Sequence, residues 1–265
     1  MKTGILFFDI DGTLVEESSH QIPESAMDAL YRARDRGHLL FINTGRCRSF
    51  LPDAVNAFPF DGFCCACGAH IEYRGKMLME AFVSPDDIIH IRELLERYNM
   101  YGILQGPQYC WFSQNADGYD SILPFQQVTG KDYLGRKKSI NEDPRSMQVN
   151  KLVCFRQDDC DYSAFCREAK AHYQVIDLGK NFTEILPLPY TKASCMDYLM
   201  NFFRIDRSEC YVFGDSPNDL PMLRHVPNSI CMGNGHEEVK RAAAFVTDPI
   251  DRDGLRNAMV RLGLI

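Results

Sequence analysis

The stretch that decides the fold is "ILFFDIDGTL", residues 5–14, in which an unbroken apolar run ends in two aspartates one residue apart. Residues 5–8 are all apolar, which is typical of a strand buried on both faces of a parallel sheet. Asp9 and Asp11 follow where that strand should end. Because Asp-Gly after a strand often marks only a turn, the rest of the sequence has to show whether these carboxylates have a chemical role.

The composition is that of a folded globular protein. The chain has 265 residues, 45% hydrophobic and 25% charged, which suits one large domain or two smaller ones. A formal net charge of −7 gives no general attraction to nucleic acid or to anionic membranes, so we expect neither as a partner. The N-terminal residues lack the pattern of a signal peptide, and no apolar segment is long enough to span a bilayer. We therefore expect a cytoplasmic protein.

Eleven cysteines are present, and in a chain without a signal peptide we expect reduced thiols. Cys64, Cys65 and Cys67 lie close together and raise the alternative of a zinc site. Structural zinc sites use a second Cys or His pair at a set spacing, which this cluster lacks. We favour a buried strand in which cysteine is a small apolar side chain.

Strands and helices alternate at the start of the sequence. A helical pattern over residues 22–37 joins the apolar runs at 5–8 and 38–43. A strand, helix, strand order of this kind predicts two parallel neighbouring strands.

The middle of the sequence follows a different pattern. After short strands and a hairpin over residues 60–80, a helix begins with Ser84 as its N-cap. Within this middle part we predict further strands at 109–113, 151–155 and 183–188 and a helix at 161–173. The alternation of helices and strands then resumes, with helices at 191–203, 218–226 and 236–244 and strands at 209–215 and 228–234. The prediction is an α/β fold in which an α+β insertion, residues 82–187, interrupts a parallel sheet formed by residues 1–81 and 188–265.

Three of the predicted buried strands end in polar residues. In open α/β sheets, ligands bind in the crevice at the carboxyl ends of the strands, so we expect these residues to converge. They are Asp9 and Asp11 after the first strand, Thr44, Gly45 and Arg46 after the second, and Asp215, Asn218 and Asp219 after the strand at 209–215.

The converging aspartates predict a metal site. Asp9, Asp215 and Asp219 would concentrate negative charge that a buried site tolerates only beside a cation. Mg²⁺ prefers such hard oxygen ligands and usually binds a substrate phosphate as well. The Thr44 hydroxyl and the Gly45 N–H suit phosphate oxygens, and a glycine allows close approach. We therefore expect Mg²⁺ and a phosphorylated substrate.

Four motifs taken together resemble the haloacid dehalogenase superfamily of phosphatases. They are "DIDGTL", "NTGR", the lysine that precedes a helix at Lys192, and "GDSPNDLPML". The long insertion, followed by "CMGNGHEEVK" and "FVTD", resembles the Cof-type branch with its α/β cap and Rossmann-like core. The resemblance covers essentially the whole chain, and four ordered motifs are far more specific than one.

The resemblance implies roles for individual residues. Asp9 is similar to the nucleophile that forms an aspartyl-phosphate, and Asp11 to the general acid and base, whose backbone carbonyl is also a metal ligand. Lys192, together with Mg²⁺, would neutralise the transferring phosphoryl group. Asp215 and Asp219 match metal positions.

Simpler readings compete with some of these roles. Lys192 could be a solvated residue of a helix's first turn, although the helix dipole disfavours a cation there. Asn218 and Asp219 could cap the following helix. Against these readings, we take Asn218 as a phosphate contact or a neighbour of one, and Asp219 as a metal ligand or a neighbour of one. Arg46 is either a substrate contact or a solvated charge.

The substrate does not follow from the resemblance. Cof-type proteins often show Asn-Gly-Ala where this chain has Cys67-Gly68-Ala69, so a contact through that asparagine is in doubt. We expect a small phosphorylated metabolite such as a sugar phosphate. The insertion offers Tyr109, Trp111 and Gln114 toward it, although an aromatic residue on a strand is more often part of the core.

Three other functions compete with hydrolysis. A phosphomutase would transfer the phosphate within a sugar, but those relatives carry a different cap in an earlier position. A catalytically silent sugar-phosphate sensor would need no chemical residues, yet all are present. A glycosyltransferase with an Asp-x-Asp pair would not need the other three motifs.

Overall fold

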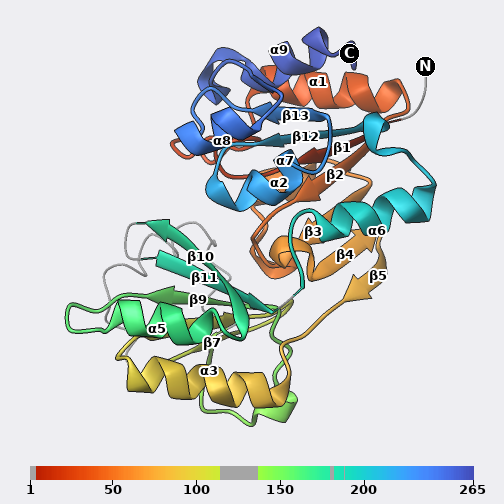
Figure 1. The fold of residues 1–265 in the computed structure, drawn as a ribbon. Helices are drawn as coiled ribbons and strands as arrows, with labels where there is room; N and C mark the ends of the chain where they lie inside the picture. The colour runs from red at the N-terminus through yellow and green to blue at the C-terminus, as the bar shows by residue number, and fades with distance from the viewer. Residues whose placement is uncertain (1–3, 114–136, 180–181, 188) are drawn as a thin grey trace. The chain divides into compact units, whose positions relative to one another are not determined.

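The structure is a computed structural model that describes residues 4–113, 137–179, 182–187 and 189–265. The chain divides into two compact units (Figure 1). Unit 1 comprises Met1–Gly45, Asp53–Met79 and Thr191–Ile265, and unit 2 comprises Arg46–Pro52 and Glu80–Tyr190. None of the helices in the described ranges is both long and apolar enough to cross a membrane.

An eight-stranded sheet forms the centre of unit 1. Its strands follow the order β14-β13-β12-β1-β2-β3-β4-β5, and all pairs from β14 to β3 are parallel, whereas β4 runs antiparallel to β3. The strands are β1 (Ile5–Phe8), β2 (Leu39–Asn43), β3 (Gly62–Cys65), β4 (His70–Tyr73), β5 (Lys76–Glu80), β12 (Cys210–Gly214), β13 (Asn228–Cys231) and β14 (Phe245–Val246). The predicted parallel sheet, with the "ILFF" run buried near its centre, is confirmed.

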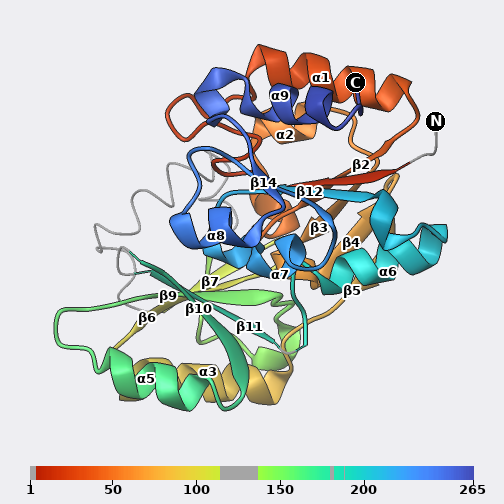
Figure 2. The same cartoon turned by 45° about the horizontal axis from the view of Figure 1, so that its top comes forward.

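Helices cover both faces of this sheet. Figures 1 and 2 show α1 (Glu24–Asp35) and α9 (Gly254–Arg261) on one face, with α6 (Ser194–Phe203), α7 (Leu220–Leu223) and α8 (Glu237–Ala242) on the other. Ile5 and Phe7 of β1 share an apolar core with Leu199 of α6, Met222 of α7 and Val239 of α8. A short helix, α2 (Asp53–Ala57), completes the unit, and the predicted helix at 218–226 is confined to α7 after a 3-10 turn at Pro217–Asp219.

Unit 2 is built on a six-stranded sheet of order β10-β11-β9-β6-β7-β8. Its elements are α3 (Pro85–Arg97), β6 (Tyr101–Gln105), β7 (Cys110–Phe112), β8 (Lys137–Ser139), β9 (Lys151–Phe155), α5 (Tyr162–Ala169), β10 (Tyr173–Gly179) and β11 (Phe182–Pro187). Ser84 caps α3 by accepting a hydrogen bond from Asp87 N, as the sequence predicts. Trp111 lies in the apolar core of this unit, and Gln114 lies outside the described residues.

Parts of unit 2 differ from the sequence prediction. The strands β6, β8 and β10 were not expected, and the helix expected to reach Tyr173 ends at Ala169. Gly102 breaks the apolar pattern of β6 because a Cβ there would lie 2.4 Å from Leu95 Cδ1 of α3. The tight packing of helix on strand therefore places a glycine where sequence rules favour a turn.

Unit 2 differs from the predicted insertion, residues 82–187, in running from Glu80 to Tyr190 and in including one additional short segment. The segment Arg46–Pro52 follows the "TG" of the second motif, yet it packs with unit 2. Ser49 Oγ of this segment donates to Gly106 O at 2.9 Å.

The cysteines are thiols within the described chain. Cys64 and Cys65 belong to β3 and are fully buried, as predicted. Among the described residues they do not gather with other metal-binding side chains, which leaves the zinc alternative without support.

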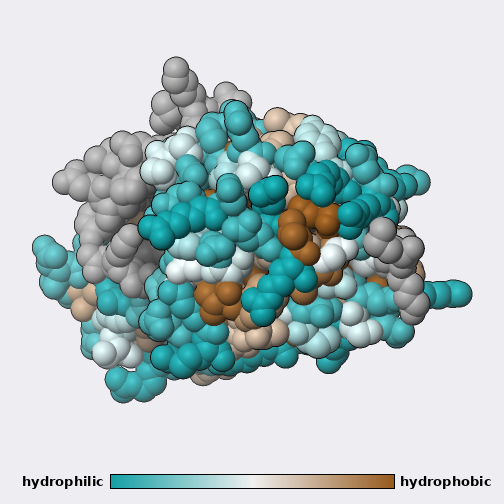
Figure 3. Space-filling view, turned by 90° about the horizontal axis from the view of Figure 1, so that it is seen from above, coloured by the Kyte–Doolittle hydropathy of each residue, from teal (hydrophilic) through white to brown (hydrophobic). Residues whose placement is uncertain are grey.

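On the face shown in Figure 3, hydrophilic residues predominate and apolar ones form only small separate patches.

Candidate active site

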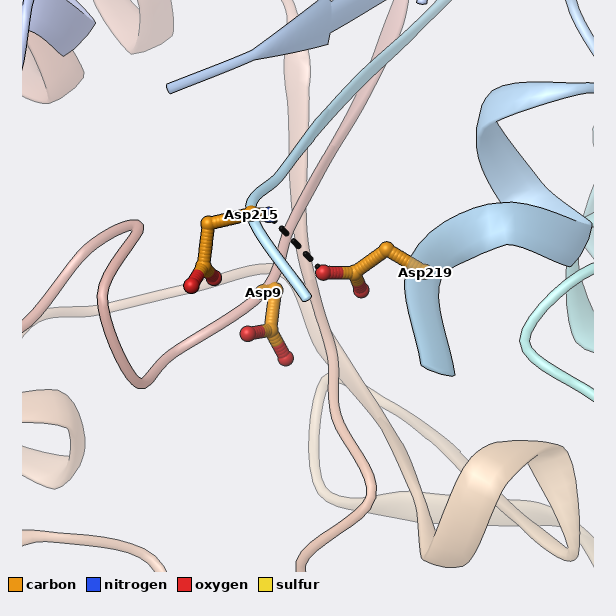
Figure 4. Close-up of side chains that lie close together, drawn as sticks. All are labelled: Asp9, Asp215 and Asp219. Atoms are coloured by element: carbon orange, nitrogen blue, oxygen red, sulfur yellow. Dashed lines mark hydrogen bonds between the residues drawn. The ribbon is translucent and has the colours of Figure 1, made fainter. Parts of the chain in front are cut away.

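The carboxyl ends of β1 and β12 place three aspartates together. Asp9 and Asp215 directly follow these neighbouring parallel strands, and Asp9 N donates to Phe213 O at 3.0 Å. One carboxylate oxygen from each of Asp9, Asp215 and Asp219 lies within 4.8 Å of the others. All three residues are buried, and Figure 4 shows their side chains gathered at the strand ends. The topology thus produces the acidic cluster that the strand-end rule predicts.

Lys192 lies between two of these carboxylates. Its Nζ donates to Asp9 Oδ1 and to Asp219 Oδ1, both at 2.6 Å. The lysine side chain is 0% exposed and extends from the turn that precedes α6. The cluster therefore holds three carboxyl groups against one ammonium group.

Asp219 has a structural role beside its charge. Its Oδ2 accepts from Asp215 N at 2.9 Å, drawn as the dashed line in Figure 4, and from Ser216 N at 3.0 Å. A Cβ on Gly214 would lie 2.6 Å from Asp219 Cγ, so the strand end approaches this carboxylate closely. Capping, the simpler reading of Asp219, is present in the structure. Both of its oxygens are engaged.

Asp215 is held by the loop that follows β1. Thr13 Oγ1 donates to Asp215 Oδ1 at 2.9 Å. Gly12 has a positive φ of +77°, and a Cβ there would lie 2.5 Å from Asp215 Oδ2. Asn234 Nδ2 donates to Gly12 O at 2.7 Å and fixes this loop from the other side. Sequence reasoning missed Thr13 and Asn234; Thr13 was visible only as a member of "DIDGTL".

Burial and like charge shift the pKa values of the cluster. Burial, together with Asp219, raises the pKa of Asp9 to about 7 despite the nearby Lys192 ammonium. Burial, Asp9 and Asp219 raise the pKa of Asp215 to about 8. Burial alone would lower the pKa of Lys192, but Asp219 and Asp9 outweigh it and raise that pKa. Burial and the neighbouring carboxylates together therefore disfavour the ionised forms of Asp9 and Asp215 more than Lys192 favours them.

The donor set fits a hard divalent cation. Asp9 Oδ1 accepts a hydrogen bond from Lys192, and Asp215 Oδ1 accepts one from Thr13. The second carboxylate oxygen of Asp9 and that of Asp215 accept no hydrogen bond from the described residues. Both oxygens are carboxylate donors of the kind Mg²⁺ prefers. Asp9 and Asp215 could therefore hold a metal ion, with Asp219 beside it.

The other predicted site residues differ in their placement. Asp11 is partly exposed and raises the pKa of Asp9 through its charge. Thr44 is buried beside β3, where its N–H donates to Cys64 O at 2.9 Å, and Gly45 follows it. Asn218 accepts from Ser216 Oγ at 2.9 Å. Arg46 belongs to unit 2, where its Nη1 donates to Phe50 O at 3.1 Å.

The loop after β3 lies close to the lysine. Ala66, Cys67 and Gly68 all have positive φ, and Cys67 N donates to Thr44 O at 3.0 Å. A Cβ on Gly68 would lie 2.4 Å from Thr191 O, next to Lys192. Cof-type proteins often have Asn-Gly-Ala where this chain has Cys67-Gly68-Ala69, and Cys67 adopts a backbone conformation that Asn tolerates better.

Known proteins resemble this chain along its whole length. A family model described as haloacid dehalogenase-like hydrolase matches residues 6–259. A Bacillus subtilis protein named "Putative phosphatase YkrA" is 26% identical over 267 residues, covering 100% of both chains. The 5-amino-6-(5-phospho-D-ribitylamino)uracil phosphatase YitU of Bacillus subtilis is 24% identical over 264 residues, covering 96% of this chain and 95% of YitU.

A solved structure agrees with these relatives. BT4131, which its description calls a sugar phosphatase of HAD subclass IIB, matches with a TM-score of 0.83 and 27% identity. The match covers 99% of this chain and 100% of that chain. With a family model that spans nearly every residue and a fold shared from end to end, the chain belongs to the haloacid dehalogenase-like hydrolases, in their Cof-type branch, and is a phosphatase.

Proposed function

We propose that this phosphatase is a Mg²⁺-dependent phosphomonoester hydrolase that acts on small phosphorylated metabolites through an aspartyl-phosphate intermediate. The observation that supports it most strongly is the buried Lys192 ammonium, 2.6 Å from both Asp9 and Asp219, beside a third carboxylate at Asp215. Such a cluster is poised to receive a cation and an anionic group together.

Asp9 and Asp215 would hold the metal ion through the oxygens that accept no hydrogen bond from the described residues. When bound, Mg²⁺ supplies positive charge that favours the ionised carboxylates and neutralises phosphate oxygens. Thr13 and Asn234 keep Asp215 and the Asp9–Thr13 loop in position.

The chemistry would proceed in two displacements on phosphorus. In the first, an Asp9 oxygen forms a bond to phosphorus, the P–O bond to the leaving group breaks, and Asp11 gives its proton to the departing alkoxide. In the second, Asp11 takes a proton from water, the water oxygen bonds to phosphorus, and the acyl-phosphate bond breaks. Inorganic phosphate leaves and the Asp9 carboxylate is restored.

Lys192 would offset negative charge on the transferring phosphoryl group. It is fixed against Asp9, so its ammonium needs little rearrangement when the reacting group arrives. The Thr44 hydroxyl and the Gly45 N–H would donate to the phosphate oxygens, with Asn218 as a further contact.

The substrate class rests on the relatives. BT4131 is described as a sugar phosphatase, and YitU is named for a phosphorylated ribityl compound. Both substrates join a phosphate to a polyhydroxylated carbon chain, and we propose this class here. Unit 2 would select among such esters, with Tyr109, which is 38% exposed, as its remaining aromatic candidate.

The test is phosphate release across a panel of phosphorylated sugars and sugar alcohols, in Mg²⁺ and in excess chelator. We expect hydrolysis that stops in chelator, returns with Mg²⁺ and returns poorly with Ca²⁺, whose longer bonds misplace the phosphoryl group. Phosphorus NMR distinguishes free phosphate from an isomeric ester, the product of a mutase. Full activity in chelator would overturn the metal site, and no turnover even of p-nitrophenyl phosphate would favour a silent sensor.

The role of Asp11 has its own test. Asp11→Asn should reduce turnover of an alkyl phosphate about 10²-fold or more, and that of p-nitrophenyl phosphate less, because a nitrophenolate leaves without a proton. Single-turnover measurements separate the first displacement from the second. Equal losses in the first displacement for both substrates would remove Asp11 from the acid role.

A further inference from the structure

The sequence motifs do not by themselves explain what holds the main chain of Lys192 in place. Lys192 lies outside the regular part of α6: Met196 N and Asp197 N both donate to Ala193 O, so the helical hydrogen bonds begin one residue after Lys192. Thr191 and Ser194 close the turn around it through reciprocal side-chain bonds of 2.9 to 3.2 Å. The carbonyl of Lys192 is thus left to find a partner elsewhere.

That partner comes from β2. Asn43 is the last residue of the strand and is fully buried, and its Nδ2 donates to Lys192 O at 2.8 Å. The same Nδ2 contacts Met222 Sδ of α7 at 3.5 Å. Cys195 Sγ donates to Asn43 Oδ1 at 3.4 Å and to Lys192 O at 3.2 Å. Both polar atoms of the amide are therefore engaged by α7, by α6 or by the turn before α6.

The chemistry of these bonds separates the amide from the thiol. An amide N–H is a full donor, whereas a thiol is a weak one, so Asn43 supplies the main support of the Lys192 carbonyl. Without it that buried carbonyl would lose its strongest partner. Thr44 and Gly45 come next in the sequence, so one side chain links the proposed phosphate donors to the main chain of Lys192.

We propose that Asn43 is a positioning residue that acts through Lys192: its amide holds the lysine main chain so that the ammonium reaches Asp9 and Asp219 at once. The inference rests on the proposed function of Lys192. The two 2.6 Å contacts leave little room for displacement. A shift of the order of 1 Å at such a group can reduce catalysis by about 10²-fold.

A double-mutant cycle tests the proposal. Asn43→Ala, Lys192→Ala and the double variant are compared with the parent by kcat/KM for p-nitrophenyl phosphate in Mg²⁺, at high enzyme concentration where turnover is slow. We expect Asn43→Ala to lower kcat/KM about 10- to 100-fold in the parent and less than about twofold in the Lys192→Ala protein, because there is no ammonium left to misplace.

Two further variants separate positioning from packing. Asn43→Leu keeps the branched four-atom skeleton of the side chain without the donor and should lose activity as Asn43→Ala does, even if the alanine variant folds poorly. Asn228→Ala is the matched control: Asn228 Nδ2 also donates to backbone carbonyls of unit 1, Ser208 O at 2.8 Å and Cys210 O at 3.1 Å, away from the site. It should keep kcat/KM within about twofold.

The outcomes separate two failures. If Asn43→Ala retains parental activity, or reduces it by the same factor in both backgrounds, the positioning role is wrong while the role of Lys192 stands. If Lys192→Ala is as active as the parent, the proposed function of the lysine fails and the inference fails with it.

Discussion

Each unit of the protein buries a lysine against carboxylates, and the two sites differ in their charge. In unit 1, Lys192 faces Asp9 and Asp219, with Asp215 nearby. In unit 2, Lys151 pairs with Glu184, and both side chains are almost fully buried.

The difference in charge separates a chemical site from a structural one. A lysine paired with a glutamate carries no net charge, although Glu184 Oε2 finds no hydrogen-bond partner within the described ranges. One lysine against three aspartates is not neutral, and the like charges add to burial in raising the pKa values of Asp9 and Asp215. Burial alone therefore does not mark the active site; unbalanced buried charge does.

The largest expected effect is at the unbalanced site. Asp9→Asn keeps nearly the same shape but cannot form the aspartyl-phosphate, so kcat should fall by at least about 10³-fold. Circular dichroism and the melting temperature should remain close to those of the parent. Near-parental turnover by the purified, folded Asp9→Asn protein would show that the unbalanced charge does not mark the nucleophile.

Removing the lysine of the Lys151–Glu184 pair should reduce stability, with no direct effect on the chemistry. Lys151→Met leaves Glu184 buried without its cation and should reduce the free energy of unfolding by about 3 to 5 kcal/mol. Trp111, the only tryptophan in the chain, lies in the core of unit 2, so its fluorescence in urea reports this unit directly.

The control for Lys151→Met is removal of both charges. Lys151→Met combined with Glu184→Leu should recover most of the lost stability, since an apolar pair no longer leaves a charge uncompensated. In either protein the Mg²⁺ requirement should be unchanged. If the double variant is as unstable as the single one, charge balance is not what this pair contributes.

Two glycines with positive φ, one beside the active site and one away from it, allow the same comparison to be made by changing the backbone. A Cβ on Gly75, whose φ is +74°, would have no described atom within 4 Å, whereas a Cβ on Gly68, whose φ is +93°, would clash with Thr191 O beside Lys192. Gly75→Ala should cost about 1 kcal/mol of stability and leave kcat/KM unchanged.

Gly68→Ala should cost about 2 to 4 kcal/mol, because the clash adds to the backbone strain, and should also lower kcat/KM. Chemical denaturation and steady-state kinetics on the two purified variants provide the comparison. Equal losses at both glycines would mean that the approach of Gly68 to Thr191 has no importance for the site.

The last expected effect is a pH dependence of the metal-free protein. Because folding raises the pKa of Asp9 from 3.8 to about 7 and that of Asp215 to about 8, the native state binds more protons than the unfolded chain between about pH 4 and 8. Stability, and with it the melting temperature, should therefore fall as pH rises through this window.

Saturating Mg²⁺ should flatten this slope, since the cation binds the ionised carboxylates of the native state. Asp215→Asn removes one titrating group and should flatten it without metal. Thermal unfolding at constant ionic strength gives both slopes, and a melting temperature that rises with pH in the metal-free parent would contradict the charge deficit.

Much of the fold follows from short-range patterns. The apolar run Ile5–Phe8 predicts a central strand, and the alternation of strands and helices predicts the parallel sheet. The meeting of Asp9 and Asp215 follows from that topology, because neighbouring parallel strands end at the same edge.

What sequence reasoning missed depends on contacts between distant residues. Thr13 lies in the loop after β1 and Asn43 ends β2, and the importance of both appears only when Asp215 and Lys192, 202 and 149 positions away, are seen beside them. β6 was missed because Gly102 belongs to the packing of α3 and not to a turn. Arg46 is the last residue of the second motif but belongs to unit 2, which no local pattern shows.

The path of the chain through Arg46–Pro52 limits how this protein can be rebuilt. An insertion that could be exchanged as a cassette would be entered once and left once, but here the chain passes between the units after Gly45, Pro52, Met79 and Tyr190. Excising residues 80–190 would separate the short segment from the rest of its unit and leave Ser49 without the Gly106 carbonyl. Recombination that transplants substrate preference must therefore carry two separate pieces of the gene, and a chimera that moves only the long one starts with a defect directly after its proposed phosphate-binding loop.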